Sequence, residues 1–280
     1  MSVKYALEEL YAALKELELM YSPASASGQQ VIADESSLIG MGTGQLQAPH
    51  CDVEEFALRE FSGPASLDKV VKRVNRYQRQ LVSTYEDWAE STAAGLEAAA
   101  PEDRDAIIAA AVATLIALLR QHGHQAIPEA AIVTAAGAGM TPRFLSQLGT
   151  MVSANDSFLD GSLGPSIADR LRQAVRDPAI MATGALAIVG ALMALRARVA
   201  AYAGQAWAAG ALGTGERATV MGRGVRWVLD DQAQHCDDCP RYAGFYPSFD
   251  DMLAQTGGAM PGAGVQCDGN CRCQLLEWEM

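Results

Sequence analysis

The cysteines of this chain are unevenly distributed, and their spacing limits how its C-terminal end can fold. Five of the six lie between residues 236 and 273, namely Cys236, Cys239, Cys267, Cys271 and Cys273. The two residues between the first pair let both sulfurs reach one ion at about 2.3 Å, the usual zinc–sulfur distance. The sequence therefore predicts a tetrahedral thiolate site that holds together a small C-terminal module.

Three distal cysteines compete for the two remaining places of this tetrahedron. Alternation along a strand would send Cys271 and Cys273 to the same face, so both could reach the ion. Equally, Cys267 and Cys271 could complete the site and leave Cys273 in the core. We expect Zn²⁺ bound by Cys236, Cys239, Cys267 and Cys271, with Cys273 as the alternative distal ligand. His235 is a weaker candidate, because neighbouring residues rarely bind the same ion.

Other interpretations of the cluster are less favoured. A redox C-x-x-C motif would begin a helix after a strand, whereas this one precedes Pro240 and has a matching distal cysteine set. An iron–sulfur cluster would also accept four thiolates, and the sequence does not exclude this alternative. A catalytic zinc keeps one coordination position open, whereas five sulfurs and one histidine compete here for four places. The chain also has no H-E-x-x-H motif. These observations predict a closed structural site and no enzymatic activity.

Composition predicts closely packed helices with an acidic surface. Half of the residues are apolar, and the excess lies in alanine, which favours helix. The 33 acidic and 21 basic residues give a net charge of −12, which disfavours nucleic acid and anionic membranes as partners. No cationic, apolar secretory signal is visible at residues 1–21, so we expect cytosolic synthesis, where thiols stay reduced.

Hydrophobic periodicity divides the chain into four parts. Residues 1–21 predict an N-terminal helix, and residues 22–50 predict a loop or extended arm rich in Ser, Gly and Gln. Residues 51–212 predict an alanine-rich helical body, and residues 213–280 predict the zinc-binding module. The expected fold is therefore mainly α, with a small C-terminal β module stapled by zinc.

Start and stop signals place the helices of the body. We expect one helix over residues 66–96 and a second from Pro101 to about Gln121, with Gly123 as its stop signal. Further helices are expected from Thr141-Pro142 and over residues 166–176.

Residues 178–195 carry no charge, and their length is the threshold for a membrane span. Because this run consists largely of Ala and Gly and continues through Arg196 and Arg198 without an apparent break, a buried helix of a bundle is favoured.

After residue 210 the sequence pattern changes from alanine-rich helix to frequent glycines and short alternating runs. Glycines at positions 213, 215, 222 and 224 indicate a linker, residues 225–229 alternate as a short strand would, and residues 271–275 alternate again. From residue 221 to residue 280, four arginines against nine acidic residues leave a charge of −5. Phosphate binding needs the opposite sign, so we expect this module to contact protein rather than nucleic acid.

Several runs together resemble a known family. They are "RVAAYAGQAWAAG", "VRWVLDDQAQHCDDCPRYAG" and "CDGNCRCQLLEW", which resemble the C-terminal half of tailed-bacteriophage minor head proteins similar to the F protein of phage Mu. The resemblance covers residues 196–278. Many relatives have a histidine shortly before the N-C-x-C segment, where this chain has Cys267.

The resemblance implies a structural virion protein in the head or neck region, near the portal vertex. It would be made in the host cytoplasm, be oligomeric in the particle, contact the portal or major capsid protein, and assist head assembly or DNA packaging and delivery. The alternative is a membrane-active delivery protein that uses residues 178–195. A host zinc-ribbon regulator is disfavoured by the charge of the module.

Overall fold

The structure is a computed structural model, and it describes residues 58–136, 138–231, 235–266 and 271–279. The N-terminal helix and arm expected over residues 1–50 lie outside the described residues, as do Cys51 and Cys267. The described part is mainly helical and carries a small sheet near its C-terminal end, which confirms the predicted fold class.

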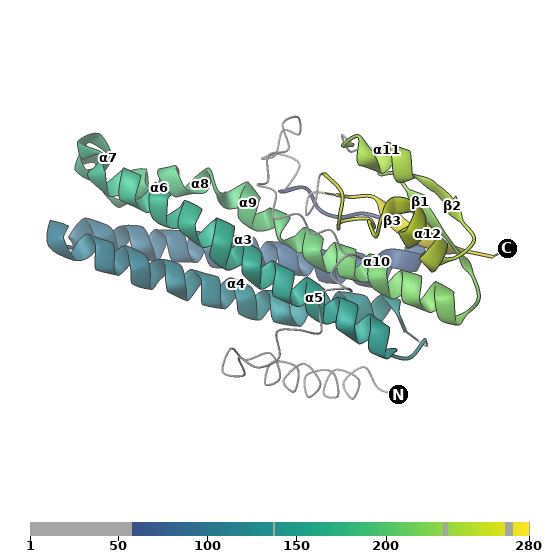
Figure 1. The fold of residues 1–280 in the computed structure, drawn as a ribbon. Helices are drawn as coiled ribbons and strands as arrows, with labels where there is room; N and C mark the ends of the chain where they lie inside the picture. The colour runs from purple at the N-terminus through teal and green to yellow at the C-terminus, as the bar shows by residue number, and fades with distance from the viewer. Residues whose placement is uncertain (1–57, 137, 232–234, 267–270, 280) are drawn as a thin grey trace.

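Within the described residues, the chain runs along an elongated bundle four times (Figure 1). The first two passes are α3 (Asp68–Ala98) and α4 (Arg104–Thr134), joined by the short helix η2 (Pro101–Asp103). The third is a rod made of α5 (Pro142–Phe158), a π-helical turn (Leu159–Leu163) and α6 (Gly164–Arg176). The fourth returns through α7 (Pro178–Thr183), α8 (Ala185–Met193), α9 (Arg196–Ala201) and α10 (Ala203–Val220).

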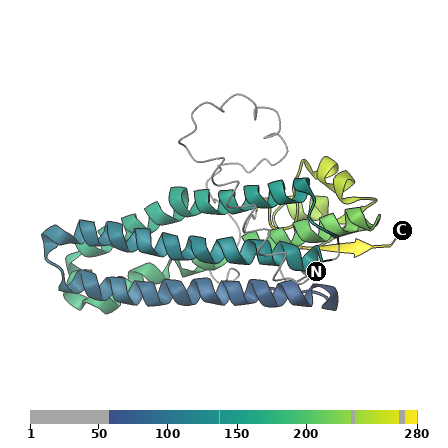
Figure 2. The ribbon, with the colours of Figure 1, turned by 90° about the horizontal axis from the view of Figure 1, so that it is seen from below.

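The helices pack through the apolar stripes that the periodicity indicates. Figure 2 shows α3, α4 and the α5–α6 rod side by side, with α4 between the other two. The inward face of α3 carries Val70, Val74, Leu81 and Tyr85, each almost fully buried. The side chain of Thr141 caps α5 by accepting a hydrogen bond from the Phe144 amide at 3.1 Å. The expected start of α5 and the expected helix over residues 66–96 are thus confirmed.

Gly123 does not stop α4, so that expectation is wrong. The helix continues to Thr134, and a Cβ at Gly123 would lie 2.7 Å from Asn155 Nδ2 and 3.2 Å from Tyr77 Oη. The glycine is there because two buried side chains from neighbouring helices approach the backbone of α4 at this point. Close packing, which a single sequence does not reveal, outweighs the helix-breaking tendency of glycine.

The uncharged run over residues 178–195 is not one continuous helix either. Gly184 has φ +89° and separates α7 from α8, and a second break follows Met193. The resulting pieces have six and nine residues, whereas a membrane-spanning helix needs about 20. The break places α7 at the far end of the bundle, where the chain turns back (Figure 1).

Two segments of the described residues meet the length and composition expected of a membrane span. Within residues 101–134, one 18-residue window has a mean hydropathy of 1.5, and 33% of that window is buried. Helix α8 passes only together with residues 196–220, across a bend of 46°. Helices in the core of a soluble protein pass the same test, although such helices are mostly buried.

The prediction of a glycine linker after residue 212 is wrong up to Val220, where α10 ends. Gly213 and Gly215 lie inside α10, and the expected boundary between body and module falls within this helix. A Cβ at Gly213 would lie 2.1 Å from the Ala131 carbonyl oxygen of α4, and one at Gly215 would lie 2.4 Å from the Phe249 ring. These glycines allow α10 to approach both the bundle and the module closely.

The C-terminal module is built on a three-stranded antiparallel sheet in the order β2-β1-β3. Its strands are β1 (Gly224–Val228), β2 (Gly244–Tyr246) and β3 (Gln274–Trp278), and its helices are α11 (Asp238–Tyr242) and α12 (Phe249–Thr256). Strand β1 agrees with the expected pattern. The closing strand exists but begins at Gln274, so Cys271 and Cys273 lie before β3 and not on the strand that was expected over residues 271–275. Strand β2 and helix α12 were not expected. One face of the sheet buries Val225, Trp227 and Leu275, and α10 packs against β1 and β3.

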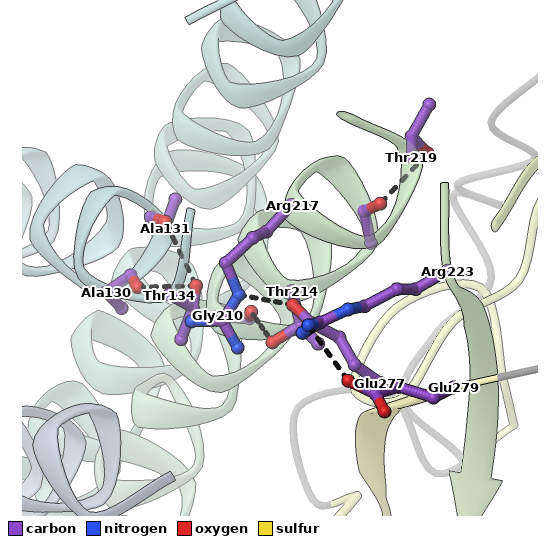
Figure 3. Close-up of polar contacts among 11 residues, drawn as sticks. Ala130, Ala131, Thr134, Gly210, Thr214, Arg217, Thr219, Arg223, Glu277 and Glu279 are labelled. Atoms are coloured by element: carbon purple, nitrogen blue, oxygen red, sulfur yellow. Dashed lines mark hydrogen bonds and ion pairs between the residues drawn. The ribbon is translucent and has the colours of Figure 1, made fainter. Parts of the chain in front are cut away.

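Ion pairs and hydrogen bonds join the module to the bundle. Glu277 of β3 is paired with Arg217 of α10 and with Arg223, whose Nη1 lies 3.0 Å from the carboxylate (Figure 3). Trp207 of α10 donates from Nε1 to the Cys273 carbonyl at 2.7 Å. A single apolar cluster runs through both regions, so the module rests on the body rather than on a core of its own.

Candidate metal centre

The pairing of β1 with β3 brings the two halves of the cysteine pattern together. Val228, at the end of β1, lies opposite Gln274, at the start of β3. The residues that follow β1 and those that precede β3 must therefore meet at the same edge of the sheet. His235, Cys236 and Cys239 come from the first segment, and Cys271 and Cys273 come from the second.

Two of the distances between sulfurs match the edge of a tetrahedral metal site. Cys239 Sγ lies 3.6 Å from Cys236 Sγ and 3.8 Å from Cys271 Sγ. With metal–sulfur bonds of about 2.3 Å, the edge of a tetrahedron measures about 3.8 Å. Cys239 contacts thiols from both halves of the pattern and is completely buried, so it lies at the middle of the group.

His235 completes a compact group with two of these thiols. The ligand atoms of His235, Cys239 and Cys273 all lie within 4.8 Å of one another. Its Nε2 lies 2.9 Å from the Asp230 carbonyl oxygen, which can only accept a hydrogen bond, so Nε2 donates there; Nδ1 lies 3.6 Å from Cys273 Sγ. A metal-binding histidine commonly donates from its second nitrogen in this way. His235 was disfavoured because it is adjacent to Cys236 in the sequence, but its ring nevertheless lies close to the thiols of Cys239 and Cys273.

Five donors therefore gather where four were expected. Three expected ligands, Cys236, Cys239 and Cys271, lie in the group, and so does the alternative ligand Cys273. Cys267, the fourth expected ligand, lies outside the described residues. The described residues are thus sufficient to hold one metal ion.

The surroundings of Cys273 oppose negative charge on its thiol. A hydrogen bond with Cys239 lowers the pKa of Cys273, but the hydrogen bond with Cys271 and burial outweigh it and raise that pKa to about 11. A bound cation would reverse this balance, because it favours the thiolate and displaces the proton.

Arg272 places a positive charge beside the cysteines. Its guanidinium lies 3.5 Å from the centre of the Phe61 ring, and its Nη2 donates to the Arg59 carbonyl at 3.2 Å. Burial lowers the pKa of Arg272 to about 10, while Cys271 and Asp230 act to raise it, so the side chain stays charged at neutral pH. This charge offsets part of the negative charge that several thiolates would bring into a buried site.

A second polar group lies away from the module, at the π-helical turn. Arg120 of α4 donates to both oxygens of Asp160 at 2.6 and 2.7 Å, and His124 Nε2 lies 2.8 Å from Asp156 Oδ2. These pairs join α4 to the α5–α6 rod. The pairs of His124 and Arg120 with Asp156 both run from α4 to α5, so this group links two helices.

No family model, curated protein or solved structure matches this chain.

Proposed function

We propose that this chain is a structural minor head protein of a tailed-bacteriophage virion, with a C-terminal docking module held together by one zinc ion. The observation that carries the metal part is the meeting of five donors from segments more than 30 residues apart in sequence, with Cys239 at 3.6 and 3.8 Å from thiols of both segments. The resemblance of residues 196–278 to minor head proteins supports the phage part.

The donor chemistry favours zinc among the metals that proteins use. Thiolates and imidazole are the ligands that structural zinc takes, in four-coordinate sites such as Cys₄ and Cys₃His. Three of the described thiols are almost fully buried, and more than four donors are at hand, which favours a closed four-coordinate site over one that keeps a water ligand. A closed site of this kind contributes folding free energy instead of catalysis.

The rest of the molecule is suited to assembly. The long alanine-rich helices present extended surfaces for packing against other subunits, and the net charge of −12 disfavours direct DNA binding. We infer that the helical body makes the contacts with other copies and that the module docks on the portal or the major capsid protein, in the head or neck region.

Elemental analysis tests the metal centre. We expect one zinc per chain in the wild type and loss of zinc in Cys239→Ser, because Cys239 contacts both halves of the donor set. Cys51→Ser is the matched control and should keep its zinc. A folded chain without metal would contradict the zinc site, and iron in its place would indicate an iron–sulfur cluster.

Mass spectrometry of purified virions tests the phage assignment separately. The chain should be found in particles in low copy number relative to the major capsid protein. Its absence from particles would contradict a virion role, whatever the metal content.

A membrane-active delivery protein is a second candidate, and one observation favours it. Within residues 101–134, an 18-residue window has a mean hydropathy of 1.5 and is only 33% buried. The segment first considered, residues 178–195, is broken at Gly184 and is less suited to this role. Leakage from dye-loaded liposomes would support this candidate, and a protein that leaves liposomes intact would contradict it.

A further inference from the structure

The thiols of the metal centre differ in how far solvent reaches them. Cys239, Cys271 and Cys273 are 0%, 2% and 1% exposed, whereas Cys236 is half-buried. An oxidant must touch a sulfur to react with it, and reactivity of cysteine follows exposure as well as thiolate character. Among the described residues, Cys236 is therefore the thiol at which a small peroxide first meets the centre.

The half-buried thiol has a buried partner within reach. Cys236 Sγ lies 3.6 Å from Cys239 Sγ, and only Asp237 and Asp238 separate the two cysteines in the chain. A disulfide needs the sulfurs at about 2.05 Å, so a rotation of one side chain together with a small shift at the start of α11 joins them. No rearrangement of the sheet is required.

We propose that Cys236 and Cys239 form a peroxide-sensitive pair whose oxidation to a disulfide releases the metal ion. The inference rests on the metal centre proposed above. It assigns a chemical modification to this site that a purely structural zinc does not require.

The reaction balances in two steps with hydrogen peroxide as oxidant. The Cys236 thiolate attacks one peroxide oxygen, the O–O bond breaks, and hydroxide leaves, which gives a sulfenic acid. The Cys239 thiolate then attacks the sulfenic sulfur, the S–S bond forms, and the S–O bond breaks with loss of a second hydroxide. Two thiolates lose two electrons, the peroxide gains two, and two protons from solvent convert the hydroxides to water.

Loss of this pair removes two of the five described donors. His235, Cys271 and Cys273 remain, and Cys239, the sulfur that contacts both halves of the set, no longer binds as a thiolate. The affinity for zinc then falls, and with it the folding free energy that the ion contributes to the module. Oxidation would thus loosen the module while the packed helices stay intact.

The test uses the full-length, reduced, zinc-loaded protein. Hydrogen peroxide is added, zinc release is followed with a chromogenic chelator, and disulfides are mapped by peptide mass spectrometry. We expect zinc release together with one disulfide that joins Cys236 to Cys239, and recovery of zinc binding after treatment with dithiothreitol and zinc. Zinc retained after peroxide, or a disulfide between other cysteines, would overturn the inference.

Two variants sharpen the result. Cys236→Ser should slow the release at least about tenfold, because the exposed thiol is gone and the remaining described sulfurs are buried. Cys51→Ser should release zinc at the wild-type rate. An unchanged rate of zinc release in Cys236→Ser would overturn the inference. If that variant binds no zinc, the inference is decided by whether the disulfide mapped in the peroxide-treated wild type joins Cys236 to Cys239. Zinc measured before peroxide separates the two claims, because its absence at that point contradicts the metal centre itself.

Discussion

The helical body and the C-terminal module reach their folds by different means. In the body, long helices bury continuous apolar stripes, and glycine allows backbones to approach closely, as at Gly213. In the module, three strands of three to five residues and two short helices enclose a group of metal donors. Short elements cannot bury enough apolar surface to offset the entropy of ordering them. The comparison teaches that packing suffices for the body, whereas the module packs against a neighbour and, by our proposal, also needs an ion.

Removal of the metal should separate the two regions most clearly. A chelator should cost the module on the order of 10 kcal/mol of folding free energy, the typical contribution of structural zinc. Trypsin should then cleave within residues 224–278, while far-UV circular dichroism keeps most of its helical signal. The same chelator saturated with zinc is the control. Simultaneous loss of the helical signal would show that the shared apolar cluster couples both regions.

A truncation inside the body should have the next largest effect. Leu119→Ala should lower the free energy of unfolding by about 2–5 kcal/mol, because the side chain is 1% exposed and leaves a cavity. Its neighbour Leu118 is 38% exposed, so Leu118→Ala should change stability by less than about 0.5 kcal/mol. Urea denaturation followed at 222 nm, the α-helical band, measures both. Equal effects would contradict the burial of Leu119 within the bundle.

The close contact between α10 and α4 gives a test of the glycines. Gly213→Ala should destabilise by about 1–3 kcal/mol, since the added Cβ would meet the Ala131 carbonyl oxygen at 2.1 Å. Gly190→Ala in α8 is the matched control, because nothing lies within 4 Å of its added Cβ, and alanine should stabilise that helix by up to about 1 kcal/mol. If Gly213→Ala stabilises the protein, the close contact with α4 is contradicted, and the flexible linker that the sequence predicts is favoured at this position.

The smallest effect is expected at the junction of the two regions. Glu277→Gln should lower stability by about 1–2 kcal/mol, because the half-buried carboxylate accepts hydrogen bonds from Arg217 and Arg223 (Figure 3). Glu279 is 82% exposed at its side chain, so Glu279→Gln should have little effect. Thermal unfolding of both variants provides the measurement. If Glu277→Gln lowers the stability of the module alone, the contacts of Glu277 with Arg217 and Arg223 anchor the module without stabilising the body.

Local patterns predicted what depends on local structure. The stripe of apolar residues placed α3, the Thr141-Pro142 signal placed α5, and alternation placed β1. The same reasoning was wrong for Gly123 and Gly213. Glycine is common at helix ends because of its backbone freedom, but inside these helices it makes room for atoms of a neighbouring helix. Strand β2 was missed because three residues are too short to show a period. His235 was underrated because adjacency in sequence says little about the direction of a ring.

By itself, the sequence determined the helical class of the body and the presence of a cysteine-rich group of possible metal ligands near the C-terminus, because periodicity and ligand spacing are properties of neighbouring residues. Only the tertiary structure decided which donors meet. The antiparallel register of β1 and β3 brings Val228 opposite Gln274, and this places His235, Cys239 and Cys273 within 4.8 Å of one another. The tertiary structure also decided that Gly213 belongs to a buried helix, because contact between distant segments depends on how whole helices pack.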